Sequence, residues 1–418
     1  MTLDSIEHGF GLLNVAHDLN DNLTSTQREL KLLHDKLAHC DMQRIQELAV
    51  DRTELGEQQI IRPMNKRVSS CMRPQCLACN LGKQTRSSTG AHQQLPTASA
   101  GGIRNNDVEP GDGVSIDQYH SSVRGRLPNT AGKEAKVKKY TGGIIFYDHA
   151  SQNVFIRHQV SLRVGETIRK KHEFEGYCKE RGVKVKKYHT DNMPFNAQEF
   201  QDDCRLQNQQ LTFSGVGAHH QNAVVERSIR TISSWTRTML LHSILHWPDQ
   251  ANLELWPFAM EHAVYVWNHL PKKGVRLSPV EIFTKSKCPD YSHLASLAVW
   301  GCPVYVLDPQ LQDGKKLPKW KPRSRQGMYL GTYVAHANTV GRILNVRTGY
   351  VSPQFHCVYD NLFSTVPSVE NGGLFNDDNP FDIQQWNALL ETGLNVDTKL
   401  NEMSMVIHCL DQHYRKNG

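Results

Sequence analysis

The sequence lacks long hydrophobic runs, since no stretch of its 418 residues approaches 18 uninterrupted apolar side chains. Its N-terminus, MTLDSIEHGFGLL, also lacks the basic region and apolar segment of a secretory leader. These absences exclude the usual signals for crossing or spanning a membrane, and we expect an intracellular protein. In a reducing compartment, ten cysteines indicate metal sites and core thiols and not a disulfide framework.

A strong excess of charge is also absent. The formal net charge is +6 and the pI is about 8.7, which permits binding to a polyanion without requiring it. Hydrophobic residues make up 39% and charged residues 22% of the chain, a composition that excludes wholesale disorder. At roughly 150 residues per domain, the chain has room for about three modules.

Composition divides the chain at two places, and there is no internal repeat. Residues 88–112 are rich in Gly, Ser, Pro and Asn, as in a linker, and the sequence turns acidic and turn-rich after about residue 364. We therefore expect an N-terminal extension (1–29), a first module (30–87), a linker (88–112), a core (113–270), a connector (271–300), a basic β module (301–365) and an acidic, partly disordered tail (366–418).

The first half of the core predicts three strands and a helix. Val114 and Ile116 alternate with polar residues, and 143–147 is expected to pair with 154–160 across a polar turn. Residues 165–181 have the pattern of a helix, which Gly182 would end.

The second half of the core continues the alternation. Residues 183–190 predict a strand that leads into Asp191, and Asn196 with Glu199 has the spacing of a capping box that starts a helix. A short strand at 211–213 and an amphipathic helix at 222–243 follow. This order of elements predicts a ribonuclease-H-like α/β fold.

Three carboxylates occupy the ends of these elements. Asp117 ends the first strand, Asp191 follows the fourth, and Glu226 lies in the first turns of the long helix, so all three can converge at one edge of the sheet. Most of the 42 acidic residues are expected to be solvated surface charges, and only the combination singles these out. Carboxylates suit two Mg²⁺ or Mn²⁺ ions about 3.5 to 4 Å apart, one activating water or a 3′-hydroxyl and one stabilising the leaving oxygen.

The segments VSIDQY, YHTDN and HHQNAVVERSIRTI, with 34 residues between Asp191 and Glu226, resemble the core of copia-type LTR retrotransposon integrases. The sequence departs from the family pattern at Met193, at Ala223 and by one residue in this spacing. The resemblance implies cleavage and strand transfer of element DNA into target DNA, and a structural role for Asp148. Arg227 and Arg230 would contact the DNA ends, or form a solvated basic face.

Upstream, LLHDKLAHC and PQCLACNLGKQTR provide His34, His39, Cys76 and Cys79. Two imidazoles and two thiolates suit one structural, tetrahedral Zn²⁺, which would contribute on the order of 10 kcal/mol to folding. The two histidines are about 140° apart around an ideal helix, so the helix must end or distort near the second. Cys40 and Cys71 are alternative ligands. The segment resembles the zinc-binding domain that precedes the copia-type integrase core.

The C-terminal module alternates between apolar and polar residues over 302–362, which predicts a small β-barrel, and the connector leads into its strands. The segment KKLPKWKPRSR has no acid, and Trp320 interrupts its cations, so it is either a DNA-backbone contact or a solvated loop. Its basic residues are Lys315, Lys316, Lys319, Lys321, Arg323 and Arg325. A compact all-β domain also follows the core in copia-type integrases, and the resemblance spans about residues 30 to 365.

Three functions remain open at this point. An active integrase would join two DNA ends as a homo-oligomer, in the nucleus, after residence in a cytoplasmic particle. A catalytically silent, DNA-binding remnant would keep only the fold. A ribonuclease H is less favoured, because that activity uses another carboxylate order and has no upstream His/Cys domain. With no protease motif or reverse-transcriptase region beside it, the chain is expected to be a processed piece or a broken reading frame.

Overall fold

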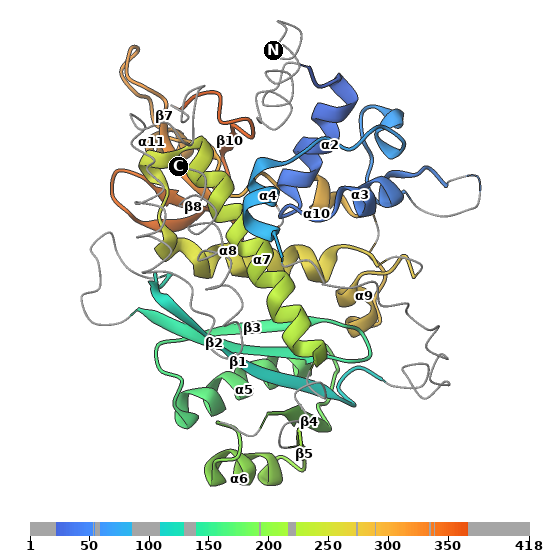
Figure 1. Cartoon of the computed structure of the whole chain (residues 1–418). Helices are drawn as coiled ribbons and strands as arrows, with labels where there is room; N and C mark the ends of the chain where they lie inside the picture. The colour runs from blue at the N-terminus through green and yellow to red at the C-terminus, as the bar shows by residue number, and fades with distance from the viewer. Residues whose placement is uncertain are drawn as a thin grey trace, which may run out of the picture. The chain divides into compact units, whose positions relative to one another are not determined.

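The computed structural model gives the chain two compact units (Figure 1). Of the residues that the structure describes, those within 22–83, 126–128 and 230–366 form unit 1, and those within 84–125 and 139–229 form unit 2. The residues that the structure describes are 22–52, 54, 59–85, 109–128, 139–191, 194–215, 223–272, 275–288, 290–333, 336–337 and 339–366. Most of the expected linker, Met193, Asn222 and the acidic tail from residue 367 lie outside them, and the module boundaries given above stay predictions.

Unit 2 is built on a mixed five-stranded sheet. Its strands are β1 (Val114–Gly125), β2 (Tyr140–Asp148), β3 (Val154–Gln159), β4 (Lys187–Thr190) and β5 (Gln210–Phe213), in the order β3-β2-β1-β4-β5. The first three pair antiparallel, whereas β4 pairs parallel to both β1 and β5. The predicted hairpin is confirmed by β2 and β3. The strand expected over 183–190 is shorter, because β4 begins only at Lys187.

Two helices of unit 2 pack on one another beside this sheet. In α5 (Val164–Glu180), Phe174 stacks on Phe146 of β2 at 4.3 Å between ring centroids. The buried ammonium of Lys171 reaches Asp203 of α6 (Gln198–Leu206) at 2.7 Å. Gly182 follows α5 with φ +71°, as predicted for its end. The predicted capping box of α6 is wrong, because the N-cap is Ala197 and no side chain caps the helix.

The helix α7 (Ala223–His246) belongs to both units, with residues up to 229 in unit 2 and those from Arg230 in unit 1. It matches the amphipathic helix expected over 222–243. The apolar positions that define its pattern are all buried. They are Val225, Ile229, Ile232, Trp235 and Met239. None of the helices that the structure describes is long and apolar enough to cross a membrane.

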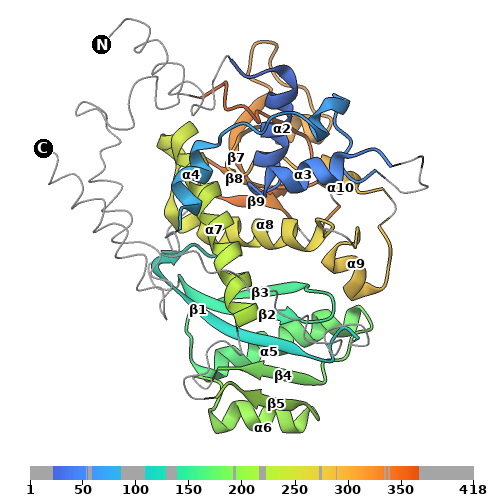
Figure 2. The same ribbon diagram turned by 45° about the vertical axis from the view of Figure 1, so that its right-hand side comes forward.

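The N-terminal part of unit 1 is a set of short helices. They are α2 (Ser25–Lys36), α3 (Met42–Ala49), η2 (Lys66–Ser69) and α4 (Leu77–Lys83). A capping box of Thr24 and Gln27 starts α2, and the Asp41 side chain caps α3. Both views place α4 against α7 (Figures 1 and 2), where the Arg237 guanidinium donates to the Gly82 carbonyl at 3.0 Å.

The C-terminal part of unit 1 combines helices and a second sheet. Short turns η4 (Pro248–Gln250) and η5 (Leu253–Leu255) separate α7 from α8 (Trp256–His269). The connector forms α9 (Pro279–Thr284) and α10 (Ser292–Ala295), so it does not lead directly into strands. An antiparallel sheet follows, with α8 lying against β7, in the order β10-β6-β7-β8-β9. Its strands are β6 (Pro303–Leu307), β7 (Ser324–Thr332), β8 (Gly341–Asn345), β9 (Val351–Gln354) and β10 (Cys357–Tyr359), with α11 (Pro309–Gln312) after β6. Closure into a barrel stays a prediction.

Candidate metal centres

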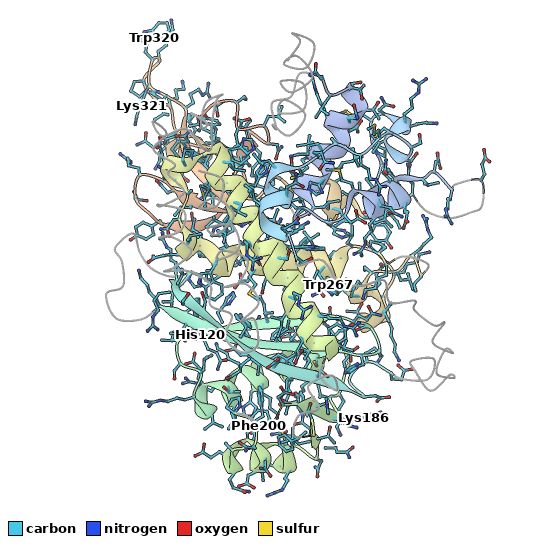
Figure 3. All side chains as sticks on the ribbon, in the orientation of Figure 1. His120, Lys186, Phe200, Trp267, Trp320 and Lys321 are labelled. Atoms are coloured by element: carbon cyan, nitrogen blue, oxygen red, sulfur yellow. The ribbon has the colours of Figure 1, made fainter. Side chains whose placement is uncertain are left out.

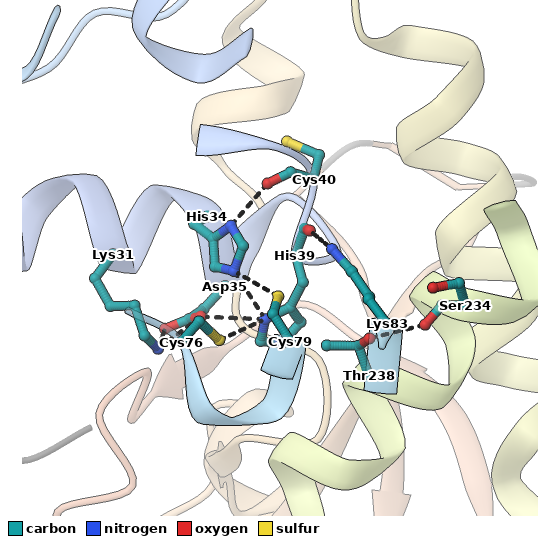
Figure 4. Close-up of polar contacts among 10 residues, drawn as sticks. All are labelled: Lys31, His34, Asp35, His39, Cys40, Cys76, Cys79, Lys83, Ser234 and Thr238. Carbon is teal, nitrogen blue, oxygen red and sulfur yellow. Dashed lines mark hydrogen bonds and ion pairs between the residues drawn. The ribbon is translucent and has the colours of Figure 1, made fainter. Parts of the chain in front are cut away.

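The four predicted zinc ligands meet in unit 1. The ligand atoms of His34, His39, Cys76 and Cys79 all lie within 4.8 Å of one another (Figure 4). The His34 Nε2 atom is 3.2 Å from both Cys79 Sγ and His39 Nδ1, and His39 Nδ1 is 3.6 Å from Cys76 Sγ. Tetrahedral Zn²⁺, with its usual bonds to nitrogen and sulfur, spaces its donor atoms roughly 3.3 to 3.8 Å apart. The donor set therefore fits a zinc ion in both chemistry and spacing.

The backbone brings the two histidines together by ending the helix between them. The last helical residue of α2 is Lys36, and Ala38 and His39 then take left-handed conformations with φ +54° and +55°. The His39 amide donates to the His34 carbonyl at 2.8 Å and closes this turn. The prediction that the helix ends near the second histidine is confirmed.

The surroundings of the histidines set which nitrogen faces the cluster. Because a carbonyl can only accept, His34 Nδ1 donates to the Cys40 carbonyl at 2.7 Å and leaves the Nε2 lone pair directed at the other ligands. Asp35 lies 3.4 Å from His39 Nδ1 and is itself held by Lys31 at 2.9 Å. The Lys83 ammonium donates to the His39 carbonyl.

The electrostatics favour the protonation states that a metal requires. Burial, together with the neighbouring His242 and His34, lowers the pKa of His39 well below its ordinary value, so this imidazole is neutral. The hydrogen bond between the two cysteines raises the pKa of Cys76 and lowers that of Cys79. Cys79 is therefore the thiol that ionises first, and metal binding would displace the proton from Cys76.

The two alternative ligands do not join this cluster. Cys71 Sγ lies 3.6 Å from the Val68 carbonyl, and the sulfur of Cys40 points away from the histidines (Figure 4). Among the described residues, Cys40 and Cys71 belong to neither of the groups whose geometry suits a metal. A second such group, Asp35, His39 and His242, adds a residue of α7 that sequence reasoning missed. No local spacing marks His242, because only the packing of α7 brings it to His39, with ring centroids 4.8 Å apart.

Two of the predicted carboxylates lie side by side in unit 2. β1 and β4 pair in parallel register, with Ile116 opposite Thr190. The next residues along the chain are Asp117, within β1, and Asp191, directly after β4. Neighbouring strands are about 4.8 Å apart, so the two aspartates occupy adjacent positions. The prediction that Asp117 ends the first strand is wrong, because β1 continues to Gly125 in its pairing with β2. Both side chains are half-buried, and one Asp117 oxygen accepts the Gln118 amide at 2.8 Å.

Glu226 lies in the first turn of α7, in the part of this helix that belongs to unit 2 with the sheet. Strand alternation puts Asp117 on the same face as Ser115 and its partner Tyr147, whereas Ile116 and Phe146 face α5. Burial and the neighbouring charge of Asp148 raise the pKa of Tyr147 to about 12, and the charge of Arg227, in the first turns of α7, opposes that rise. Glu226 is half-buried beside Arg227.

The three carboxylates do not form a tight single-ion site. Among the described residues, they are not a set of ligand atoms within 4.8 Å of one another. A two-ion site is wider than a single-ion site, because its ions are themselves about 3.5 to 4 Å apart. The structure thus sets Asp117 and Asp191 side by side, and the convergence of Glu226 with them stays a prediction.

Asp148 has a different environment from these three. It is buried, and its Oδ1 accepts the Gly111 amide at 2.8 Å. Its Oδ2 accepts both the amide and the hydroxyl of Ser151, at 2.8 and 2.6 Å. Asp148 therefore holds the turn after β2, in agreement with the structural role expected for it.

The predicted basic residues are almost all on the surface. Arg227 and Arg230 are exposed on α7, and the cations between α11 and β7 are exposed as well. Arg325 differs, because it lies within β7 opposite Val306 and is half-buried.

Comparisons with known proteins give a structural likeness only. No protein-family model and no curated protein matches the chain. The HTLV-2 integrase catalytic core domain in complex with magnesium, in dimeric and trimeric forms, is 20% identical, with a TM-score of 0.30, over 42% of this chain and 98% of that chain. The simian T-cell lymphotropic virus intasome in complex with the PP2A regulatory subunit B56 gamma is 15% identical, with a TM-score of 0.32, over 62% of this chain and 84% of that chain.

Proposed function

We propose that the chain is a copia-type retrotransposon integrase, whose unit 2 is a ribonuclease-H-like catalytic core. The observation that carries the proposal is the parallel register of β1 and β4, which puts Asp117 beside Asp191. The three sequence segments that contain Asp117, Asp191 and Glu226 support the same reading.

In this proposal the three carboxylates hold two Mg²⁺ or Mn²⁺ ions. Bound there, the ions would supply an activated oxygen nucleophile and stabilise the leaving oxygen of a DNA phosphodiester. The half-buried aspartates are fixed by their strands, which keeps the ligand oxygens oriented before DNA arrives. Exposed Arg227 and Arg230 would contact DNA phosphates next to the reacting end.

The His/Cys cluster would hold one structural Zn²⁺, and the cations from Lys315 to Arg325 would bind the DNA backbone. We further propose that the protein works as a homo-oligomer, since two DNA ends must be joined, and that it acts in the nucleus.

The test is strand cleavage and transfer by the full chain, with Mn²⁺ and oligonucleotides that carry the element's terminal sequence. Asp191→Asn should lose activity by at least about a hundredfold, because the substitution removes a charged metal ligand. Asp202→Asn is the matched control, since Asp202 is a surface residue of α6 that pairs with Arg205. Equal activity in Asp191→Asn and the wild type would refute the catalytic assignment. DNA binding without any cleavage in the wild type would instead identify a catalytically silent remnant.

A further inference from the structure

The loop between α11 and β7, residues 313–323, is anchored at its base and ends in a tight turn. The Asp308 amide donates to the Arg323 carbonyl at 2.8 Å, next to the β6–β7 pairing of Leu307 with Ser324. At the tip, the Lys321 amide donates to the Pro318 carbonyl at 3.0 Å. Figure 3 shows Trp320 and Lys321 at the end of this projecting loop. Backbone hydrogen bonds therefore hold both the base and the tip of the loop.

The tip presents a tryptophan to solvent. Trp320 is 86% exposed, although most other tryptophans in the described part of the chain are buried. Lys319 Nζ lies 4.8 Å from the centroid of the Trp320 ring. A single exposed apolar side chain is ordinary on protein surfaces, so exposure alone identifies no partner.

The charges around Trp320 indicate which kind of partner the loop would bind. Four lysines and Arg323 are exposed in this loop, and Asp313, its one acidic residue, lies 3.6 Å from Lys315. An aromatic ring surrounded by cations complements a nucleobase flanked by phosphates, the combination that binds single-stranded nucleic acid.

The flat face of the Trp320 ring also favours DNA with unpaired bases over a regular duplex. In a regular duplex the bases stack on one another and offer only their edges in the grooves. Inside a duplex an indole face can stack on a base only where that base is unpaired or splayed. A blunt end offers one face of its terminal pair, whereas an opened end offers several free base faces next to flexible phosphates. We propose that Trp320 stacks on an unpaired base of the DNA and that the loop lysines bind the adjacent phosphates. This inference rests on the proposed function.

The experiment compares two oligonucleotides that differ only at one end. Fluorescence anisotropy with the full chain, without Mg²⁺ or Mn²⁺, gives the affinity for a blunt duplex and for the same duplex with a few unpaired nucleotides. Wild type should favour the open end by roughly tenfold, and Trp320→Ala should abolish that preference, whereas Trp320→Phe should keep most of it. Tyr350→Ala, which removes another exposed aromatic residue of unit 1, should leave the preference unchanged.

A second variant separates stacking from charge. Lys319→Gln with Lys321→Gln should weaken binding to both oligonucleotides equally, because phosphate contacts do not depend on base pairing. The proposal is overturned if Trp320→Ala weakens both equally, if it weakens neither, or if wild type has no preference. Cleavage by a wild type that lacks the preference would leave the proposed function standing and remove only this inference.

Discussion

At the scale of single residues, the His/Cys cluster gives each ligand a distinct role. His34 is oriented by its hydrogen bond to the Cys40 carbonyl, and His39 is kept neutral by burial. The hydrogen bond between the two thiols raises the pKa of Cys76 and lowers that of Cys79. Because the four donors already have spacings close to those of a tetrahedral ion, metal binding requires little rearrangement of the side chains.

Cys76→Ser should therefore remove bound zinc. A hydroxyl is a far weaker ligand than a thiolate, and the loss of one of four donors should lower the zinc content by about one ion per chain. The measurement is metal analysis of the purified protein by mass spectrometry after dialysis.

Cys71→Ser is the matched control, because Cys71 lies in the same segment but outside the cluster. Its zinc content should stay at the wild-type level. Loss of zinc from Cys71→Ser, or unchanged zinc in Cys76→Ser, would contradict the ligand set.

Spacing in the sequence was enough to predict the four ligands but not the groups around them. Two histidines near a helix end and a Cys-x-x-Cys segment carry their own signal. Lys83 lies far along the chain from His39, and His242 farther still. Only tertiary packing brings these residues to His39, so no local pattern could identify them.

At the scale of elements, α4 packs closely on α7 through a glycine. A Cβ atom added at Gly82 would lie 2.6 Å from Thr238 Oγ1 and 3.2 Å from the Thr238 Cα. The Arg237 guanidinium binds the Gly82 carbonyl at the same place. The helix that carries Cys79 is thereby fixed to the part of α7 that lies in unit 1.

Gly82→Ala should destabilise unit 1 by about 1 to 3 kcal/mol, the usual cost of forcing extra atoms into a well-packed contact. Gly176→Ala is the control, because Gly176 also lies within a helix but has open space around its Cβ position. That variant should instead gain about 0.5 to 1 kcal/mol from the better helix propensity of alanine. Urea unfolding of both variants measures the two effects, and a neutral Gly82→Ala would show that α4 and α7 are not tightly packed.

Elements with strong periodicity were predicted well, and those decided by tertiary hydrogen bonds were not. β4 begins late because the Val183 amide caps α5 at the Cys178 carbonyl and the Lys186 amide binds the Gly111 carbonyl. β9 contains Pro353, which cannot donate a ladder hydrogen bond, and its place at the edge of the second sheet tolerates that residue. The capping box predicted for α6 is wrong because a turn, closed by the Ala197 amide on the Pro194 carbonyl, precedes the helix and moves its N-cap to Ala197.

At the scale of the whole molecule, unit 1 joins segments from both ends of the sequence around buried histidines. His262 of α8 is buried beside Tyr329 of β7, at 6.0 Å between ring centroids. Gly331, with φ +101°, leaves room for it, since a Cβ there would lie 3.0 Å from His262 Nδ1. Burial lowers the pKa of His262 to about 4, and burial lowers that of His269 to about 4 as well.

This burial predicts that unit 1 loses stability in acid. In the unfolded chain a histidine has a pKa near 6.5, so between about pH 6.5 and pH 4 the unfolded state binds more protons than the folded state. The stabilisation is complete above pH 6.5 and is lost as the pH falls toward 4, by about 3 kcal/mol for His262. Arg342 of β8 lies near and further disfavours the charged imidazole.

His262→Asn isolates this contribution from the acid release of zinc, which affects wild type and variant alike. Between pH 7.5 and pH 4.5, the free energy of unfolding should fall by about 2 to 3 kcal/mol less in the variant than in the wild type, as measured by urea unfolding at each pH. His356→Asn, at an exposed position, should keep the wild-type pH dependence. Parallel pH profiles for His262→Asn and the wild type would mean that His262 binds protons equally in the folded and unfolded states, so that its burial between α8 and the second sheet does not lower its pKa.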